Sequence, residues 1–272
     1  MHTPVLLQET VDALEIQPGG KYIDATYGLG GHSSAILERG GIVLALDWDS
    51  DSLARQKINN QSLTVINGNY ADIKDLAQKH HFVPCQGIVF DLGLSMEQIR
   101  LSGRGFSYEK GDEPLDMRIS SDLELTAAKI INSCTIEQLY EIFARNAEEL
   151  NSRTIAQAIN RSRHVSPIQT VNDLINSIST VTKNKSAIAR IFQALRMEVN
   201  NELENIKKGL EGAMAILVPG GKIAIISFHP TEDRVIKQFI RQHDLKTLKK
   251  PITATDPQSF ERSAKLRIII KN

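Results

Sequence analysis

Short apolar runs alternate with amphipathic segments through the first 93 residues. The apolar runs have the length and the β-branched content of buried strands: KYIDA (21–25), GIVLALD (41–47), LTVING (63–68) and GIVFDLG (87–93). The segments between them, SSAILERG, DSLARQKI and IKDLAQKH, are typical of helices. This rhythm predicts an α/β fold in which crossover helices join a mainly parallel sheet.

The rhythm stops after Gly93 and returns near the end of the chain. A loop rich in Gly, Ser and charge (94–118) leads into a long stretch of helical patterns, which includes an apolar face from Ile188 to Leu217. The run PGGKIAIISFH (219–229), a helix and the strand AKLRIIIKN then resume the first pattern. We expect a discontinuous sheet domain, 1–104 and 205–272, interrupted by an all-helical domain at 105–204.

Composition and charge narrow the class of protein. The chain has 272 residues, 41% of them hydrophobic, and a formal net charge of zero, so affinity for nucleic acid must come from local patches. Residues 145–190 and 234–272 are such basic patches, although solvated helix faces would look the same. Cys85 and Cys134 have no metal-ligand spacing, and no apolar run is long enough for a membrane span. We expect a cytoplasmic protein without metal.

The first βαβ unit carries a glycine-rich loop. Asp24 ends the first strand, the loop Gly28-Leu29-Gly30-Gly31 follows, and Asp47 ends the second strand. Glycines there allow close backbone approach, and Asp47 is placed for a carboxylate that accepts the hydroxyls of a ribose. NAD and S-adenosylmethionine sites share this pattern, and glycine turns also occur without function.

Three details favour S-adenosylmethionine over NAD. Ser33 replaces the third glycine that a pyrophosphate needs for close helix approach. Asp24 would balance a sulfonium and an amino group but would repel a pyrophosphate. Asn69 and Tyr70 follow the third strand, where an adenine could lie against the aromatic ring, although Tyr70 could equally close a strand without any role in binding.

Two further strand ends place polar residues at the same sheet edge. The fourth strand ends in DLGLS (Asp91 to Ser95), and the fifth in SFHPTEDR, which contains His229. The carboxyl edge of a doubly wound sheet is where ligands bind. Alternatively, Asp91 caps the next turn, and Thr231-Glu232-Asp233 cap a helix.

The motifs taken together resemble one family, the bacterial 16S ribosomal RNA cytosine-N4 methyltransferases. The matching stretches run in order through nearly the whole chain: HTPVLLQE (2–9), YIDATYGLGGHS (22–33), ALDWD (45–49), DLGLS (91–95), RGFS (104–107), PLDMR (114–118), FQALR (192–196), VNNEL (199–203), PGGKIAIISFH (219–229), EDR (232–234) and RSAKLR (262–267).

The resemblance implies a Rossmann-like class I S-adenosylmethionine-dependent methyltransferase with a helical insertion. Its cofactor S-adenosylmethionine would be held by residues of the glycine loop and of the strand ends: Asp24, Gly28, Gly30, Gly31, His32, Asp47, Tyr70, Asp91 and Gln98. Its substrate would be a cytidine in the decoding centre (P site) of the small subunit. Binding of that substrate is expected from Arg104, Phe106, Arg118, Arg190, Arg196 and Asn200.

The reaction would be an in-line displacement without metal. We expect Asp91, Ser95 and His229 to form the catalytic wall, with Asp116, a fourth catalytic candidate, and Arg118 closing over the base. Further candidates for phosphate contacts are Arg153, Arg161, Arg163, Lys237, Arg241, Lys249 and Lys250. The partner would be 16S rRNA or the small ribosomal subunit, and the chain could be a monomer or a homodimer.

Departures from the family pattern keep two other functions open. Met96 replaces the usual second serine after DLGVS. Asn146-Ala147 replace the first two residues of the usual YGEE, and Pro230-Thr231 replace the serine and leucine of the usual FHSLEDR. These changes lie mainly on the substrate-facing half. The chain could therefore be a diverged paralog that methylates another RNA, or a ribosome-assembly factor with weak activity. An NAD-dependent oxidoreductase is the third possibility.

Overall fold

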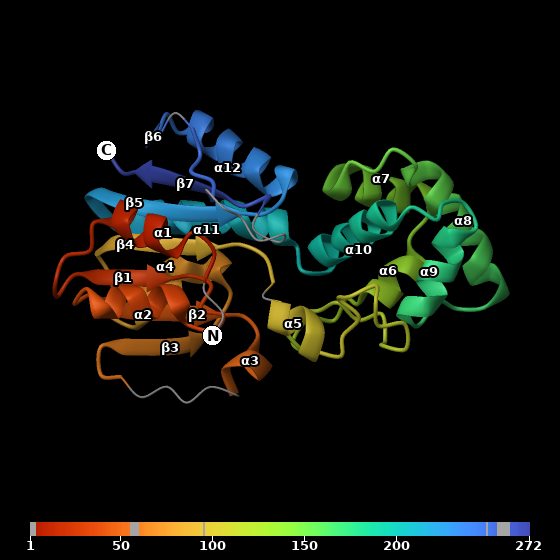
Figure 1. The fold of residues 1–272 in the computed structure, drawn as a ribbon, viewed down its shortest axis with the longest axis horizontal. Coiled ribbons are helices and arrows are strands. Elements are labelled where there is room, and N and C mark those ends of the chain that lie inside the picture. Colours follow the sequence, from red (N-terminus) through yellow and green to blue (C-terminus); the bar gives the residue numbers. More distant parts are fainter. Residues whose placement is uncertain (1–3, 55–59, 95, 249, 255–261) are drawn as a thin grey trace. The chain divides into compact units, whose positions relative to one another are not determined.

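The computed structural model describes residues 4–54, 60–94, 96–248, 250–254 and 262–272 (Figure 1). The chain divides into two compact units, residues 1–93 with 203–272, and residues 94–202. The sequence instead places the boundaries at 104/105 and 204/205. Residues 94–104 therefore cluster with the helical unit rather than with the sheet unit.

The sheet unit is built on seven strands within the described residues, in the order β3-β2-β1-β4-β5-β7-β6. Their bounds are β1 Lys21–Asp24, β2 Ile42–Asp47, β3 Leu63–Asn67, β4 Cys85–Asp91, β5 Leu217–Ser227, β6 Lys246–Thr247 and β7 Lys265–Ile270. The first five pair in parallel, whereas β7 is antiparallel to β5 and β6. The predicted α/β class with a mainly parallel sheet is confirmed.

The strand order reverses at β1, which pairs with β2 on one side and β4 on the other. In register, Ile23 lies beside Leu44 and Ile88, so apolar side chains continue across the three strands. Strands buried on both faces need such runs, which is why these segments could be recognised from the sequence. The reversal point is where an open α/β sheet binds ligands.

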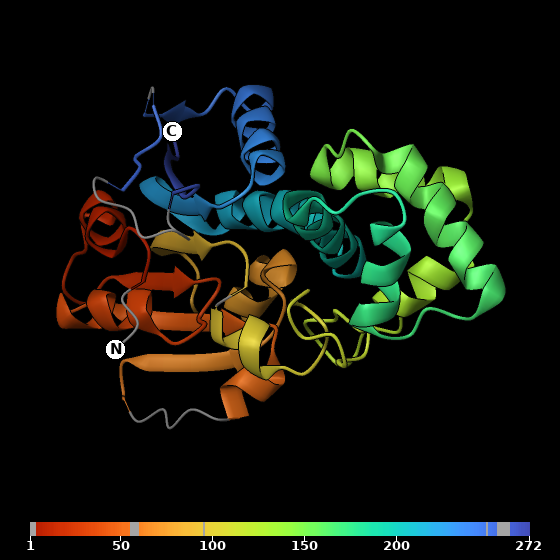
Figure 2. The same ribbon diagram turned by 45° about the vertical axis from the view of Figure 1, so that its right-hand side comes forward.

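Helices cover both faces of the sheet (Figure 2). Alternate strand residues divide between two cores: Ile23 and Leu44 pack with α4 (Ile73–Lys79), α11 (Glu202–Ile216) and α12 (Pro230–Gln242). Tyr22 and Val43 pack with α1 (Leu7–Leu14) and α2 (Gly31–Glu38). The remaining elements are α3 (Ser50–Ala54) and the 3₁₀ helix η1 (Tyr70–Asp72).

The helical unit has its own core. Its helices are α5 Met96–Leu101, α6 Ala127–Ser133, α7 Ile136–Ala147, α8 Ser152–Val165, α9 Val171–Ser179 and α10 Lys185–Val199. Leu139, Ile155, Leu174 and Ile191 are fully buried in one cluster. Capping boxes begin α7 at Thr135 and α9 at Thr170, which satisfies free backbone N–H groups there.

Three local predictions differ from the structure. The segment predicted as a loop after Gly93 contains α5, and α1 has no counterpart among the predicted elements. The apolar face from Ile188 to Leu217 belongs to α10 and α11, which are separated at Asn200 and Asn201, and Leu217 already starts β5. Asn201 has φ 50, a left-handed conformation that ends a helix and that periodicity cannot reveal. None of the helices in the described part of the chain is both long and apolar enough to cross a membrane.

Candidate active site

Three carboxylates end three neighbouring strands at the reversal point of the sheet. Asp24 is the last residue of β1, Asp47 of β2 and Asp91 of β4. Because parallel strands end at one edge, the three side chains share that edge. Burial raises the pKa of the Asp47 and Asp91 carboxyls, and the charge of Asp24 adds to both shifts. A cluster of negative charge of this kind fits a cationic ligand.

Asp24 is held in place from the glycine loop. Its side chain is 1% exposed; Oδ1 accepts from the N–H of Thr26 at 3.2 Å, and Oδ2 accepts from the Ser33 hydroxyl at 2.7 Å. Ser33 is itself fully buried. The residue that replaces the third glycine therefore fixes the orientation of the first carboxylate.

The glycine loop is tied to the second carboxylate. Gly28 donates its N–H to Asp47 Oδ2 at 2.9 Å, and Asp49 donates to Oδ1 at 2.9 Å. Gly30 has φ 77, and a Cβ atom there would lie 2.8 Å from the ring of Tyr27, so another residue would be strained and would have to displace this ring. Burial raises the pKa of Asp47 to about 6 against these bonds, so the carboxylate is ionised at neutral pH.

Asp91 carries a polar atom that lacks a partner. Its backbone N–H donates to Thr26 Oγ1 at 2.7 Å, but its side-chain Oδ1 is inaccessible and accepts no hydrogen bond from the described residues. Burial, and then the charges of Asp24 and Glu232, raise the pKa of Asp91 to about 8. An unsatisfied buried acceptor is costly, and a ligand that brings positive charge would remove the cost.

His32, in the first turn of α2 after the glycine loop, carries a second buried atom without a hydrogen-bond partner among the described residues. His32 is 4% exposed, and its Nε2 has no hydrogen-bond partner in the described part of the chain. Burial lowers the pKa of the imidazole although Asp24 acts to raise it, so the ring is neutral at physiological pH. His32 Nε2 and Asp91 Oδ1 are thus two buried polar atoms that a polar cofactor could bond, so the residues at this sheet edge fit such a cofactor.

Tyr70 lies beyond the end of β3. It opens η1, which Asn69 caps by accepting from the N–H of Ala71 at 2.9 Å. The half-buried Tyr70 ring meets Phe90 edge to face, with 5.7 Å between ring centroids and an interplanar angle of 85°. Phe90 precedes Asp91 on β4, so Tyr70 is packed against the same strand that supplies the third carboxylate.

His229 caps α12 at the end of β5. Its Nδ1 accepts from the N–H of Thr231 at 3.3 Å, and Glu232 Oε2 accepts from the N–H groups of Phe228 and His229. Asp233 pairs with Arg267 at 2.6 Å and Lys237 at 3.5 Å. Of the predicted caps Thr231, Glu232 and Asp233, only Glu232 caps the helix with its side chain in the described contacts, together with His229; Thr231 contributes its backbone N–H and Asp233 forms ion pairs instead. A catalytic role of His229 stays a prediction.

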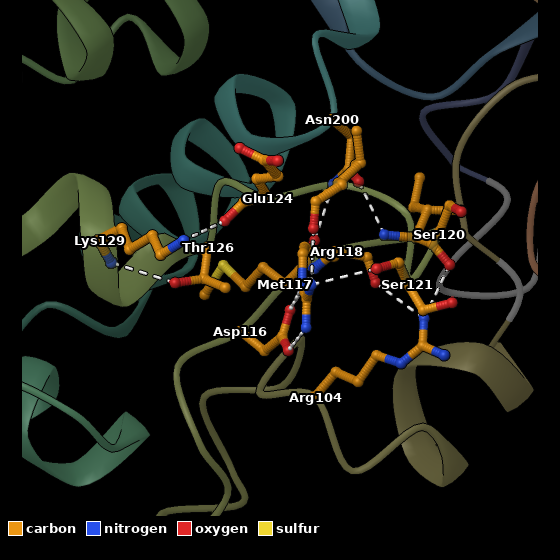
Figure 3. A network of polar contacts seen from close by, with 12 residues as sticks. Arg104, Asp116, Met117, Arg118, Ser120, Ser121, Glu124, Thr126, Lys129 and Asn200 are labelled. Atoms are coloured by element: carbon orange, nitrogen blue, oxygen red, sulfur yellow. Dashed lines mark hydrogen bonds and ion pairs between the residues drawn. The ribbon is translucent and has the colours of Figure 1, made fainter.

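In the helical unit, Asp116 and Arg118 form a two-bonded ion pair (Figure 3). The Arg118 Nε–Asp116 Oδ1 distance is 2.7 Å and the Nη2–Oδ2 distance is 2.8 Å. Arg118 Nη1 also donates to the carbonyls of Ser121 and Leu123. Burial acts to raise the pKa of Asp116, but the bonds from Arg118 outweigh it and hold this pKa below its usual range.

Arg104 and Asn200 hold the backbone next to this pair (Figure 3). Asn200 is fully buried; its Nδ2 donates to the Met117 carbonyl at 2.8 Å, and its Oδ1 accepts from the N–H of Ile119 at 2.7 Å. Arg104 Nη1 donates to the carbonyls of Arg118 and Ile119. Met117, between Asp116 and Arg118, has a left-handed backbone conformation with φ 61. These contacts fix the segment that presents Asp116 and Arg118.

The other predicted substrate residues of this unit also have partners within it. Arg190 pairs with the buried Glu149, and Arg196 pairs with Glu202 through two bonds of 2.8 and 3.0 Å. Phe106 packs against the helical core. Gln98 lies on α5 in this unit, whereas Ser95 and Lys249 lie outside the described residues.

The predicted cofactor residues other than Gln98 thus come together on the sheet unit, whereas the predicted substrate residues belong to the helical unit. Sequence reasoning missed Thr26, Phe90 and the bond between Ser33 and Asp24. The spacing of Glu232, three residues after His229, is a capping-box signal that pointed to its role. Within the described ranges, no group of three His, Cys, Asp or Glu side chains is arranged to hold a metal ion.

Comparison with known proteins identifies the family of the chain. The family model described as "MraW methylase family" matches residues 1–272. A Ribosomal RNA small subunit methyltransferase H of Desulfotalea psychrophila is 39% identical over 290 residues, covering 100% of this chain and 98% of that protein. The protein of the same name from Thermomicrobium roseum is 42% identical over 252 residues, covering 89% and 77%. Among solved structures, an rRNA methylase from Streptococcus thermophilus matches with a TM-score of 0.47 and 10% identity over 100% of this chain and 98% of that one. The chain belongs to the MraW methylase family, and its cofactor is S-adenosylmethionine.

Proposed function

We propose that the chain transfers a methyl group from S-adenosylmethionine to the N4 amine of a cytidine in the decoding centre of 16S ribosomal RNA. The family and the names of its relatives support ribosomal RNA of the small subunit as the substrate. The observation that carries the proposal is the unsatisfied Oδ1 of Asp91 beside Asp24, at the sheet edge where the strand order reverses.

The sheet unit would hold the cofactor. Asp91 and Asp24 would face its positively charged methionine end, and Asp47 would accept the ribose hydroxyls beside the bond from Gly28. Tyr70 would lie against the adenine, while Gly30, Gly31 and His32 would line the loop. A pyrophosphate would meet the carboxylate of Asp24, which disfavours a dinucleotide at this site.

Bound S-adenosylmethionine supplies an electrophilic methyl group on a sulfonium. The cytosine amine is a weak nucleophile because its lone pair is delocalised into the ring. Holding the amine at attack distance can contribute about 7–11 kcal/mol, and an acceptor for one amine hydrogen can add about 10²–10⁴-fold. One of the predicted catalytic residues Asp91, Ser95, His229 and Asp116 would act as this acceptor. Arg118, kept in place by Asp116, would orient the base.

Mass spectrometry of small-subunit rRNA tests the proposal. Deletion of the gene should remove N4-methylation from one cytidine, and the wild-type gene should restore it while the Asp91→Ala variant should not. An unchanged modification pattern would refute the substrate assignment. Restoration of growth by Asp91→Ala without restored methylation would instead favour the assembly-factor alternative.

A further inference from the structure

Gly209 lies inside α11 at the point where this helix contacts η1 and β4. A Cβ atom at Gly209 would lie 2.9 Å from Cδ2 of the Tyr70 ring, 3.2 Å from the Tyr70 carbonyl oxygen and 3.3 Å from Cε1 of Phe90. All three atoms belong to the sheet unit, as Gly209 does. Real Cβ atoms almost never make a contact as short as 2.9 Å, and the other two distances are also tighter than most Cβ contacts. A larger residue would therefore have to move the Tyr70 ring, the η1 backbone or the helix.

Glycine is an unfavourable residue inside a helix, because it loses more backbone entropy than alanine. Gly209 is buried, and its neighbours Ile206 and Leu210 belong to the core between α11 and the sheet. The helix therefore cannot move away from Tyr70 without opening this core. Because Gly209 has no side chain, the Tyr70 ring can occupy the space beside the helix.

Tyr70 is thus held on two sides. Phe90 on β4 contacts the Tyr70 ring edge to face, and the α11 backbone at Gly209 packs closely against the same ring. A planar ring confined in this way presents a fixed face, which is what stacking with a nucleobase requires.

We infer that Gly209 is a positioning residue for the adenine of S-adenosylmethionine, acting through the orientation of the Tyr70 ring. The inference rests on the proposed role of Tyr70 in cofactor binding. It assigns to α11, which carries no residue expected at the cofactor site, a defined part in cofactor affinity.

The test compares two glycines of one helix in the full-length chain. Gly212→Ala is the matched control, because the three atoms nearest to its Cβ would belong to Ile73 and Lys74, the closest being Cγ2 of Ile73 at 2.8 Å. Both Gly209→Ala and Gly212→Ala should lower the melting temperature. Only Gly209→Ala should weaken S-adenosylmethionine binding, by roughly tenfold, a loss within the range of one base–aromatic stack. Titration calorimetry measures the affinity.

A double substitution separates positioning from general loosening. In a Tyr70→Leu background, Gly209→Ala should change the affinity by less than about twofold, because the stack is already lost. An undiminished effect there, or an equal effect of Gly212→Ala, would overturn the inference. If Gly209→Ala alone does not fold, restored folding in the Tyr70→Leu background supports the contact, and its absence contradicts it. Failure of the wild-type chain to bind S-adenosylmethionine would overturn the proposed function itself.

Discussion

Asp91 combines two properties that oppose each other in the unliganded chain. Burial and the charges of Asp24 and Glu232 raise its pKa to about 8, so it is largely protonated at neutral pH. Its Oδ1 nevertheless lies where no described residue can satisfy it. A site that is unfavourable when empty and favourable with a cation inside is the expected result of selection for binding rather than for stability.

The affinity for S-adenosylmethionine should therefore depend on pH. A bound sulfonium and ammonium favour the ionised carboxylate and lower the pKa of Asp91, so binding releases a proton below pH 8. Affinity should rise as pH increases from about 6 to 8 and then level off, a slope of up to one proton per ligand. Calorimetry in buffers of different ionisation enthalpy measures the released proton. Asp91→Asn should remove the slope; a slope that persists in this variant would show that another group titrates.

Asp47 supports a second prediction at the residue scale. Asp47→Ala removes the acceptor for the ribose and for the Gly28 N–H, so S-adenosylmethionine binding should weaken by about 1–3 kcal/mol. Asp49→Ala is the control, because Asp49 Oδ1 accepts from the backbone N–H groups of Asp51 and Ser52 at the start of α3. Unchanged affinity of Asp47→Ala would exclude the ribose role.

At the scale of elements, the sheet was predictable and the polar contacts were not. The runs ending in Asp24, Asp47 and Asp91 are apolar because both faces of β1, β2 and β4 are buried, and a glycine loop after a strand is a local signal. Arg190 and Glu149 are 41 residues apart, and only the packing of α10 near the end of α7 brings them together. Sequence patterns therefore identify charged residues but cannot tell those that bind substrate from those that hold the fold.

The segment held by Asn200 gives a prediction for one element. Asn200→Ala would leave the Ile119 N–H and the Met117 carbonyl without their side-chain partner, at a cost of about 1–3 kcal/mol for each buried group. Methylation of rRNA should fall further than this loss of stability explains, because Asp116 and Arg118 lose their fixed position. S-adenosylmethionine binding, measured by calorimetry, should stay unchanged.

Asn132→Ala is a matched control for this experiment. Asn132 makes the same kind of contact in the helical unit, donating to the carbonyls of Ala128 and Ile168 and accepting from the Ile168 N–H. Its loss should lower the melting temperature similarly and leave the methylation rate of folded protein near that of the wild type. Equal losses of methylation in the two variants would show that Asn200 has only a structural role.

At the scale of the whole molecule, the chemistry is divided between the two units. The sheet unit gathers carboxyl groups for a cationic cofactor, whereas the helical unit carries basic side chains. Some of these basic side chains are already bonded within the protein and others are not. Arg153 pairs with Glu137 and lies over the Tyr140 ring, and Arg163 donates to the Ile131 carbonyl and to Asn160. In the described part of the chain, the exposed Arg161, Lys183 and Lys185 make no side-chain hydrogen bond or ion pair.

These three side chains are the best candidates for phosphate contacts, because binding RNA would break no interaction within the protein. Replacing Arg161, Lys183 and Lys185 together by alanine should weaken binding to small-subunit rRNA. It should also make the negative slope of log affinity against log salt less steep by about 2, since each phosphate contact to a single strand contributes about 0.7. Arg153→Ala should change the slope little, because its charge is already paired, and neither variant should alter S-adenosylmethionine affinity. Counterion release depends on the charges that contact phosphate and not on the net charge of the chain, which is zero. A salt slope that the triple substitution leaves unchanged would therefore place the RNA contacts on other residues.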